Sequence, residues 1–191
     1  HTMFSDYFND TSVRVVDPKT VPNGIKALFY GLAGVGKTSL AGSVSKVEDY
    51  SPVLYVDLEK GSMPLIEHAD LDKTLVVQPD NFLEFKKIID MVAADGEFPF
   101  KTIVIDTIDK LQELIVYHWS SDTNSYAKWA AAYDQILLTI NTLSTKHMLN
   151  IICLTHESRE VLENVGSLMI APSFEGKKSG IKLPSVFDII G

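Results

Sequence analysis

The stretch Gly31-Leu32-Ala33-Gly34-Val35-Gly36-Lys37-Thr38 decides the fold, because it fits the pattern G-x-x-x-x-G-K-[ST]. An apolar run at residues 25–30 precedes it, and a helical pattern follows from about residue 36 to residue 47. In this strand–loop–helix frame, glycines let backbone N–H groups surround phosphate oxygens, and the start of the helix adds partial positive charge. We therefore predict a phosphate-binding loop. The alternative, a glycine-rich turn that carries Lys-Thr by chance, does not account for the flanking strand and helix.

The prediction assigns the nucleotide contacts to consecutive residues of this loop and the start of its helix. They are Gly31, Leu32, Ala33, Gly34, Val35, Gly36, Lys37, Thr38 and Ser39. We expect Lys37 to bridge the β- and γ-phosphates and the Thr38 hydroxyl to ligate Mg²⁺. The expected ligands are accordingly ATP or ADP together with Mg²⁺.

Two further apolar runs end in acidic residues. Thr102–Asp106 reads Thr-Ile-Val-Ile-Asp, and we expect Asp106 to hold Mg²⁺ through water. Val53–Asp57 is followed by Leu58 and Glu59, and Glu59 is the candidate for orienting the attacking water. The alternative is that Asp57 and Glu59 only solvate the end of their strand.

The run at residues 150–155 predicts another buried strand, which ends in Thr155 and His156. Either side chain could contact the γ-phosphate and report hydrolysis to the segment that follows, with His156 the candidate we retain. The alternative is a histidine that only caps the strand. Cys153 is interpreted as a small core residue. The other internal histidines lack metal-ligand spacing and are interpreted as structural: His68, His118 and His147.

The alternation of apolar strands with helical patterns predicts an α/β fold, in which a mostly parallel sheet is covered by helices on both faces. Asp80 is the expected N-cap of a helix that runs to about residue 94. A long apolar stripe at residues 126–143 predicts another helix. Residues 157–180 show no periodicity, which indicates a functional or mobile loop.

We expect three parts along the chain. Residues 1–3 resemble a tag remnant. Residues 4–23 form an arm or linker whose aromatic side chains pack on its own domain or on a neighbouring subunit. Residues 24–191 form one core, and the strand-like ending at residues 188–191 is consistent with a core truncated at its C-terminus.

Composition limits the function further. The 191 residues hold 17 Lys and Arg against 25 Asp and Glu, and the net charge of −8 argues against binding to nucleic acid by overall charge. One cysteine excludes a disulfide framework within the chain. No apolar run reaches the roughly 18–20 residues of a membrane span. Without a signal pattern, a cytoplasmic location is expected.

On these motifs, residues 24–191 resemble the RecA-like core of P-loop ATPases. More narrowly they resemble small phage-encoded proteins of the Sak-type group, which are linked to single-strand annealing and recombination. The resemblance implies that Glu59 is the catalytic base, that Asp106 serves Mg²⁺, and that His156 stands where RecA carries a glutamine. It also implies that the strand at residues 150–155 lies between the P-loop strand and Thr102–Asp106. A homo-oligomer in the cytoplasm of a phage-infected or prophage-carrying bacterium is the implied setting.

The resemblance places two DNA-facing loops near residues 120–127 and 157–180. It also implies a basic residue supplied by the next subunit, although the chain has only two arginines. Candidates for that residue are Arg159, Lys177, Lys178 and Lys182. The second loop carries three positive against four negative residues, so stacking on aromatic side chains would contribute more than charge to single-strand binding. Candidates near the first loop are Trp119, Tyr126 and Trp129.

The expected function is thus a Mg²⁺-dependent ATPase that acts on single-stranded DNA in recombination or replication. A nucleotide-gated, non-catalytic scaffold is the alternative. A small-molecule or nucleotide kinase would need several arginines around its phosphates. A GTPase would need base-reading motifs, which the segments after Asp106 and Thr155 do not supply.

Overall fold

A central sheet organises the molecule, a computed structural model that describes residues 24–62, 64–119, 125–146, 148–162, 167–174 and 182–191. Six of the seven strands follow the order β3-β2-β4-β5-β1-β7 and all pair in parallel, whereas β6 pairs antiparallel with β5. The strands are β1 (Lys26–Gly31), β2 (Val53–Asp57), β3 (Thr74–Val77), β4 (Thr102–Asp106), β5 (Asn150–Leu162), β6 (Ser167–Pro172) and β7 (Ile189–Ile190).

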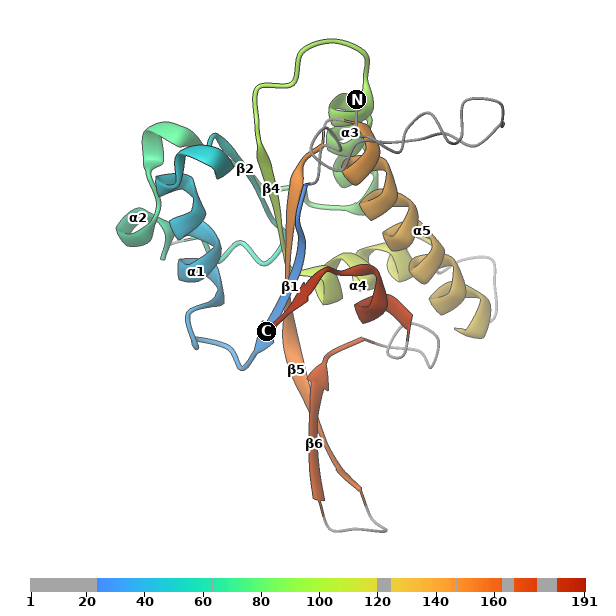
Figure 1. Cartoon of the computed structure of the whole chain (residues 1–191). Coiled ribbons are helices and arrows are strands. Elements are labelled where there is room, and N and C mark those ends of the chain that lie inside the picture. The colour runs from blue at the N-terminus through green and yellow to red at the C-terminus, as the bar shows by residue number, and fades with distance from the viewer. Residues whose placement is uncertain (1–23, 63, 120–124, 147, 163–166, 175–181) are drawn as a thin grey trace, which may run out of the picture.

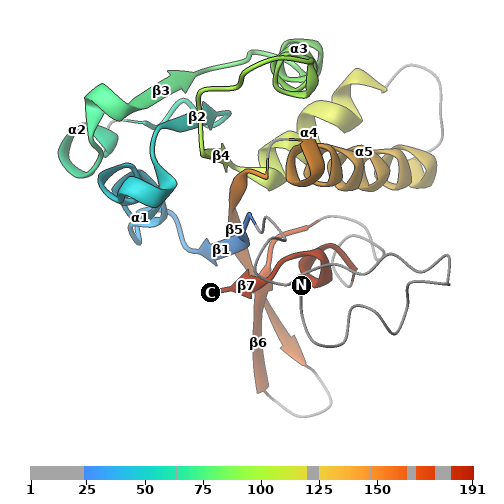
Figure 2. The ribbon, with the colours of Figure 1, turned by 45° about the horizontal axis from the view of Figure 1, so that its top comes forward.

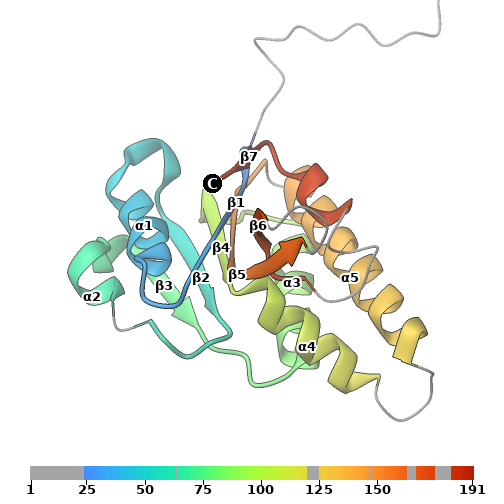
Figure 3. The ribbon, with the colours of Figure 1, turned by 90° about the horizontal axis from the view of Figure 1, so that it is seen from below.

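Helices cover both faces of this sheet (Figure 1, Figure 2). They are α1 (Lys37–Ser43), α2 (Leu65–His68), α3 (Phe82–Ala93), α4 (Ile108–His118) and α5 (Ser125–Lys146). The helices α1 and α2 lie on one face, and α3, α4 and α5 lie on the other, which Figure 3 shows from below. The expected α/β fold with helices on both faces is confirmed.

Alternation along the strands divides the apolar side chains between the two faces, as the two-residue period of a strand requires. In β4, Ile103 and Ile105 belong to the core beneath α3, α4 and α5, whereas Val104 belongs to the core beneath α1 and α2. Cys153 is fully buried in β5, as predicted for a small core residue. Burial raises the pKa of its thiol.

The strand order separates the P-loop strand from the strand that ends in Asp106. In register, Leu28 of β1 lies opposite Cys153 of β5, and Ile105 of β4 lies opposite the same residue. β5 therefore lies between β1 and β4, which confirms the order that the resemblance implied.

The expectation of an aperiodic loop from residue 157 is wrong. β5 continues past Thr155 to Leu162 and forms an antiparallel hairpin with β6, which projects from the body of the molecule (Figure 1). Leu168 and Ile170 are about half exposed on this hairpin, at 54% and 45%. The end of β5 mixes charged and polar residues and gives no strand pattern, and the apolar run Leu168–Ala171 of β6 was overlooked between segments of mixed composition. Residues 163–166 and 175–181 lie outside the described part.

The first turn of α3 also differs from the prediction. Its N-cap is Asn81, whose side chain accepts a hydrogen bond from the Glu84 N–H at 3.0 Å. The Glu84 carboxylate in turn accepts from the N–H of Asp80, the residue before the cap, at 2.7 Å, so the helix is capped one residue later than expected. The Asp80 carboxylate instead pairs with Lys60.

Candidate functional site

The P-loop connects β1 to α1, and two of its glycines adopt backbone angles that other residues disfavour. Gly34 has φ 79° and Gly36, the N-cap of α1, has φ 99°. Only glycine adopts these conformations without a steric penalty from Cβ. The loop thereby reaches the first turn of α1, which begins at Lys37.

Lys37 lies across the loop that precedes it. Its Nζ donates hydrogen bonds to the carbonyl oxygens of Gly31 and Leu32, each at 2.8 Å. Both acceptors are neutral, and a charged phosphate is a stronger partner for an ammonium group. The side chain is thus held beside the loop and can exchange these carbonyls for phosphate oxygens.

A cavity of about 260 Å³ opens beside the loop, at the ends of β1, β2, β4 and β5. It brings together Lys37 and Thr38 with Glu59, Asp106 and His156. The other described residues that line it are Ala33, Gly34, Gly36, Ser39, Gly61, Pro64 and Thr107. Three predicted contact residues do not line it: Gly31, Leu32 and Val35. Leu32 and Val35 expose 47% and 60% of their surface.

Asp106 is buried at the end of β4 and faces the start of α1. Its Oδ2 accepts hydrogen bonds from the Thr38 hydroxyl at 3.0 Å and from the Tyr55 hydroxyl at 2.6 Å. Burial raises the pKa of the Asp106 carboxyl and outweighs the lowering by these two bonds. The hydroxyl and carboxylate oxygens are hard donors of the kind that Mg²⁺ binds, so Thr38 and Asp106 fit the predicted metal site.

Tyr55 is a partner of this site that the sequence reasoning missed. It is fully buried in β2, where burial and the neighbouring Asp106 raise the pKa of its phenol. A polar hydroxyl in an otherwise apolar buried strand was the available signal, because a buried tyrosine hydroxyl usually finds a partner. Its bond holds the same Asp106 oxygen that Thr38 bonds, and Tyr55 belongs to the core beneath α1 and α2.

Glu59 is exposed at the cavity and is oriented by Thr107. The Thr107 hydroxyl donates to Glu59 Oε1 at 2.8 Å and accepts from the Lys110 N–H at 3.2 Å as the N-cap of α4. The backbone N–H groups of Leu58 and Glu59 both bond the Asp106 carbonyl oxygen, at 2.6 and 3.3 Å. These bonds tie the segment after β2 to the end of β4.

Asp57 does not share this role. Its carboxylate is buried, does not line the cavity, and accepts from the Gln78 side chain at 2.8 Å and the Gly61 N–H at 3.2 Å. Asp57 therefore holds the segment after β2 in place. For Asp57, the alternative that it only solvates the end of its strand is therefore wrong.

His156 follows the buried part of β5 and bonds to α4. Its Nδ1 lies 2.7 Å from Asp109 Oδ2, and the Thr155 hydroxyl donates to Asp109 Oδ1 at 3.1 Å. One ligand atom each from Glu59, Asp109 and His156 lies within 4.8 Å of the others. Asp109 was missed, although an acid in the first turn of a helix three residues after Asp106 was visible in the sequence.

Two of the residues proposed to supply a cation to a neighbouring subunit, Arg159 and Lys182, do not line the cavity of their own chain. Arg159 pairs with Glu157 on the β5–β6 hairpin, and Lys182 is exposed. Lys177 and Lys178 lie outside the described residues. His118, interpreted as structural, contacts the ring of Phe82 with centroids 5.4 Å apart.

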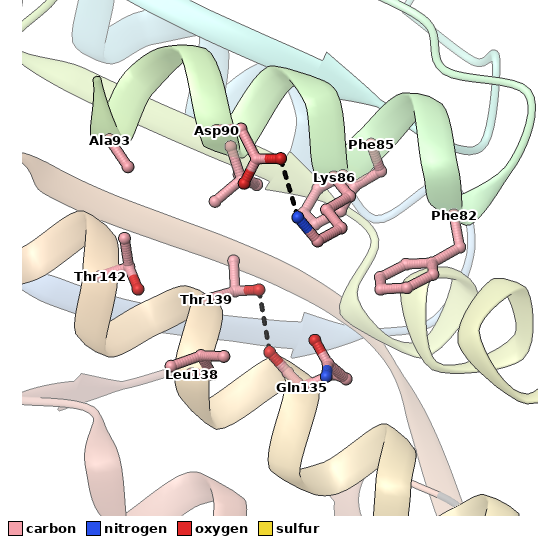
Figure 4. Close-up of a pocket in the computed structure, with 10 residues that line it drawn as sticks. Phe82, Phe85, Lys86, Asp90, Ala93, Gln135, Leu138, Thr139 and Thr142 are labelled. Carbon is pink, nitrogen blue, oxygen red and sulfur yellow. Dashed lines mark hydrogen bonds and ion pairs between the residues drawn. The ribbon is translucent and has the colours of Figure 1, made fainter.

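A second pocket, of about 110 Å³, lies between α3 and α5 (Figure 4). Its polar side chains bond within their own helices: Lys86 pairs with Asp90 at 2.8 Å, and the Thr139 hydroxyl donates to the Gln135 carbonyl. The predicted site residues do not line it. We therefore assign the functional site to the P-loop cavity.

Comparison with known proteins agrees with this geometry. A family model described as an AAA domain (AAA_24) matches residues 23–191. The chain belongs to this AAA domain family. The matched residues include the P-loop, Glu59, Asp106 and His156. It supports a nucleotide-binding protein of the ATPase type.

Other comparisons add less about function. No curated protein matches the chain. Among the solved structures that match is the crystal structure of the RadB recombinase, with 20% sequence identity and a TM-score of 0.48, over 77% of this chain and 68% of that chain. Among the helices of the described residues, none has the length and apolar character needed to cross a membrane.

Proposed function

We propose that this AAA domain is a Mg²⁺-dependent ATPase that acts on single-stranded DNA in phage recombination or replication. The observation that carries the proposal is one cavity lined by the P-loop, Asp106, Glu59 and His156. These residues come from separate parts of the chain, and the sheet places them around a volume beside the loop. Family membership supports nucleotide binding, whereas the proposed action on DNA and the phage setting rest on the motif resemblance.

In the proposed mechanism, backbone N–H groups of the P-loop and the Lys37 ammonium group bind the phosphates. Thr38 and Asp106 hold Mg²⁺, which neutralises charge on the phosphates when bound. Glu59, oriented by Thr107, positions the attacking water and accepts its proton. His156 contacts the γ-phosphate end of the cavity, and its backbone carbonyl accepts from the Ser173 N–H at 2.7 Å just beyond the β5–β6 hairpin.

Turnover is proposed to require an oligomer. Of the described residues that line the cavity, Lys37 supplies the permanent positive charge. Phosphoryl transfer is commonly accelerated by a second cation, in some enzymes supplied in trans. A neighbouring subunit would supply it from Arg159 or from one of the lysines Lys177, Lys178 and Lys182.

The β5–β6 hairpin and residues 120–127 are the proposed contacts for single-stranded DNA. The hairpin begins directly after His156, so a change at the cavity can reach it through the backbone. Trp119, 43% exposed at the end of α4, offers a ring on which a base could stack. Residues 120–124 lie outside the described part.

ATP turnover measured with and without single-stranded DNA tests this proposal. We expect phosphate release that DNA stimulates and that Lys37→Ala abolishes. A wild-type protein that binds no nucleotide would exclude the whole proposal. Among the described residues that line the cavity, Lys37 alone carries a permanent positive charge, which favours a nucleotide-gated scaffold as the second candidate. Tight ATP binding without DNA-stimulated turnover in any oligomeric state would identify that scaffold.

A further inference from the structure

We propose that Asp109 is a positioning residue that fixes the tautomer and orientation of His156, so that Nε2 of the imidazole faces the nucleotide cavity. His156 lines that cavity, whereas Asp109 lies behind it in the first turn of α4. The contact joins α4 to β5, two elements that are far apart in the sequence but adjacent where the buried part of β5 ends.

The Asp109 carboxylate is itself held from two sides. Oδ1 accepts from the Thr155 hydroxyl at 3.1 Å, and Oδ2 lies 2.7 Å from His156 Nδ1. Thr155 is fully buried, and its hydroxyl also reaches the Ser173 carbonyl at 3.3 Å. Both carboxylate oxygens therefore have a partner from β5, and the carboxylate cannot rotate without breaking one of these bonds.

The chemistry of the pair sets the proton on the ring. An ionised carboxylate only accepts hydrogen bonds, so Nδ1 must carry the proton that it donates to Asp109. In a neutral imidazole Nε2 then has the free lone pair. The nitrogen presented to the cavity is accordingly a hydrogen-bond acceptor, which suits a water molecule beside the γ-phosphate rather than an ionised phosphate oxygen.

Asparagine at position 109 reverses this arrangement. Its amide nitrogen can donate to Nδ1, which moves the proton of the neutral ring to Nε2. The side chain keeps its size and most of its contacts, so the substitution tests the tautomer rather than the packing. The inference rests on the proposed ATPase function for its effect on turnover, but the orientation of the ring can be measured without any nucleotide.

Nitrogen-15 NMR of the imidazole rings tests the tautomer directly. At about pH 8.5, where an ordinary histidine is neutral, we expect the His156 ring to carry its proton on Nδ1. His156→Gln identifies its signals among the five histidines. Asp109→Asn should move the proton to Nε2, whereas Glu113→Gln, an exposed acid on the same helix, should not. A wild-type ring protonated on Nε2, or one unchanged by Asp109→Asn, would overturn the proposal.

Kinetics test whether the orientation matters. Asp109→Asn should lower kcat by about 10²-fold, the scale expected when a reacting group is misplaced, and leave the Kd for ATP unchanged. The double variant with His156→Gln should be no slower than His156→Gln alone, because the two residues act as one unit. Additive losses would overturn the positioning role. A wild type without ATPase activity would refute the proposed function instead, and the NMR result would still decide the tautomer.

Discussion

The two sides of the nucleotide cavity are built in different ways. On the P-loop side, the lining residues fall between Ala33 and Ser39 and take their shape from backbone angles at Gly34 and Gly36. On the acidic side, the lining residues extend from Glu59 to His156 along the chain. They are held by hydrogen bonds between side chains of different elements, such as Thr107 to Glu59.

This difference separates two tasks. The P-loop side offers backbone N–H groups, the start of a helix and one ammonium group, all of which bind phosphate in the ground state. The acidic side offers carboxylates and an imidazole, which suit proton transfer and the orientation of water. Substitutions on the P-loop side should therefore weaken nucleotide binding, and substitutions on the acidic side should slow turnover without weakening binding.

The largest effect is expected from Lys37→Ala on the P-loop side. Lost phosphate binding and lost stabilisation of the transition state together should lower kcat/KM for ATP by roughly 10³–10⁵-fold. Steady-state phosphate release measures it. Lys46→Ala, which removes an exposed lysine just after α1, is the matched control and should behave as wild type. Equal kcat/KM for Lys37→Ala and wild type would remove Lys37 from the site.

Glu59→Gln should have the next largest effect, because it keeps the shape of the side chain and removes the base. Turnover should fall roughly 10²–10⁴-fold, as for loss of a general base. Phosphate release under saturating ATP gives kcat. Glu67→Gln, an exposed acid on α2, serves as the control. If Glu59→Gln turns over at the wild-type rate, another residue is the base, and the catalytic role proposed for the acidic side of the cavity is wrong for Glu59.

Thr107→Val tests the support of Glu59 with a smaller change. The loss of the α4 N-cap should lower the free energy of unfolding by about 1 kcal/mol. Turnover should fall by about tenfold because Glu59 loses the hydrogen bond that orients its carboxylate. Thermal unfolding and phosphate release measure the two effects. Thr107→Ser keeps the hydroxyl and should restore both, and a serine variant as impaired as valine would show that the methyl group matters instead.

Asp106→Asn should have the smallest effect. The measured quantity is the stability of the fold, and we expect it to increase rather than decrease. Burial raises the pKa of the native Asp106 carboxyl, so the folded protein binds its proton more readily than the unfolded chain does. The ionised carboxylate therefore opposes folding above that native pKa. Asparagine should raise the melting temperature, by about 2–4 °C for each kcal/mol gained.

The pH dependence of that gain is its check. The advantage of Asp106→Asn should be absent below the unfolded pKa of an aspartate, about 3.9, and grow as pH rises through the native pKa. Asp90→Asn, which removes an exposed acid paired with Lys86, should show no such gain. A lower melting temperature for Asp106→Asn at neutral pH would mean that its hydrogen bonds to Tyr55 and Thr38 need the charge.

The same division explains what could be predicted from the sequence. The P-loop is one contiguous segment, and its glycines are explained by the backbone angles that the loop requires. The loop could therefore be predicted before any strand order was known. Asp106 and Glu59 were found because they follow apolar strands. Their partners Tyr55 and Thr107 were not, because the pairing depends on how β2, β4 and α4 lie side by side.

The hairpin illustrates a second limit. Continuous apolar runs predicted the strands that are buried on both faces, including Val53–Asp57 and Thr102–Asp106 with their observed bounds. The end of β5 carries mixed polar and charged residues, so no such run marks it, whereas the short apolar run Leu168–Ala171 in β6 was overlooked. For the end of β5, pairing with β6 rather than the local pattern accounts for the extended conformation.

Calorimetric titration of ATP with Mg²⁺ into Lys37→Ala, Glu59→Gln and the wild type tests the central claim most directly. The account predicts that the wild type and Glu59→Gln bind one nucleotide per chain with similar Kd. Lys37→Ala should bind at least about tenfold more weakly, since it loses a charged hydrogen bond to phosphate. No binding to the wild type, or equal binding by Lys37→Ala, would contradict the account.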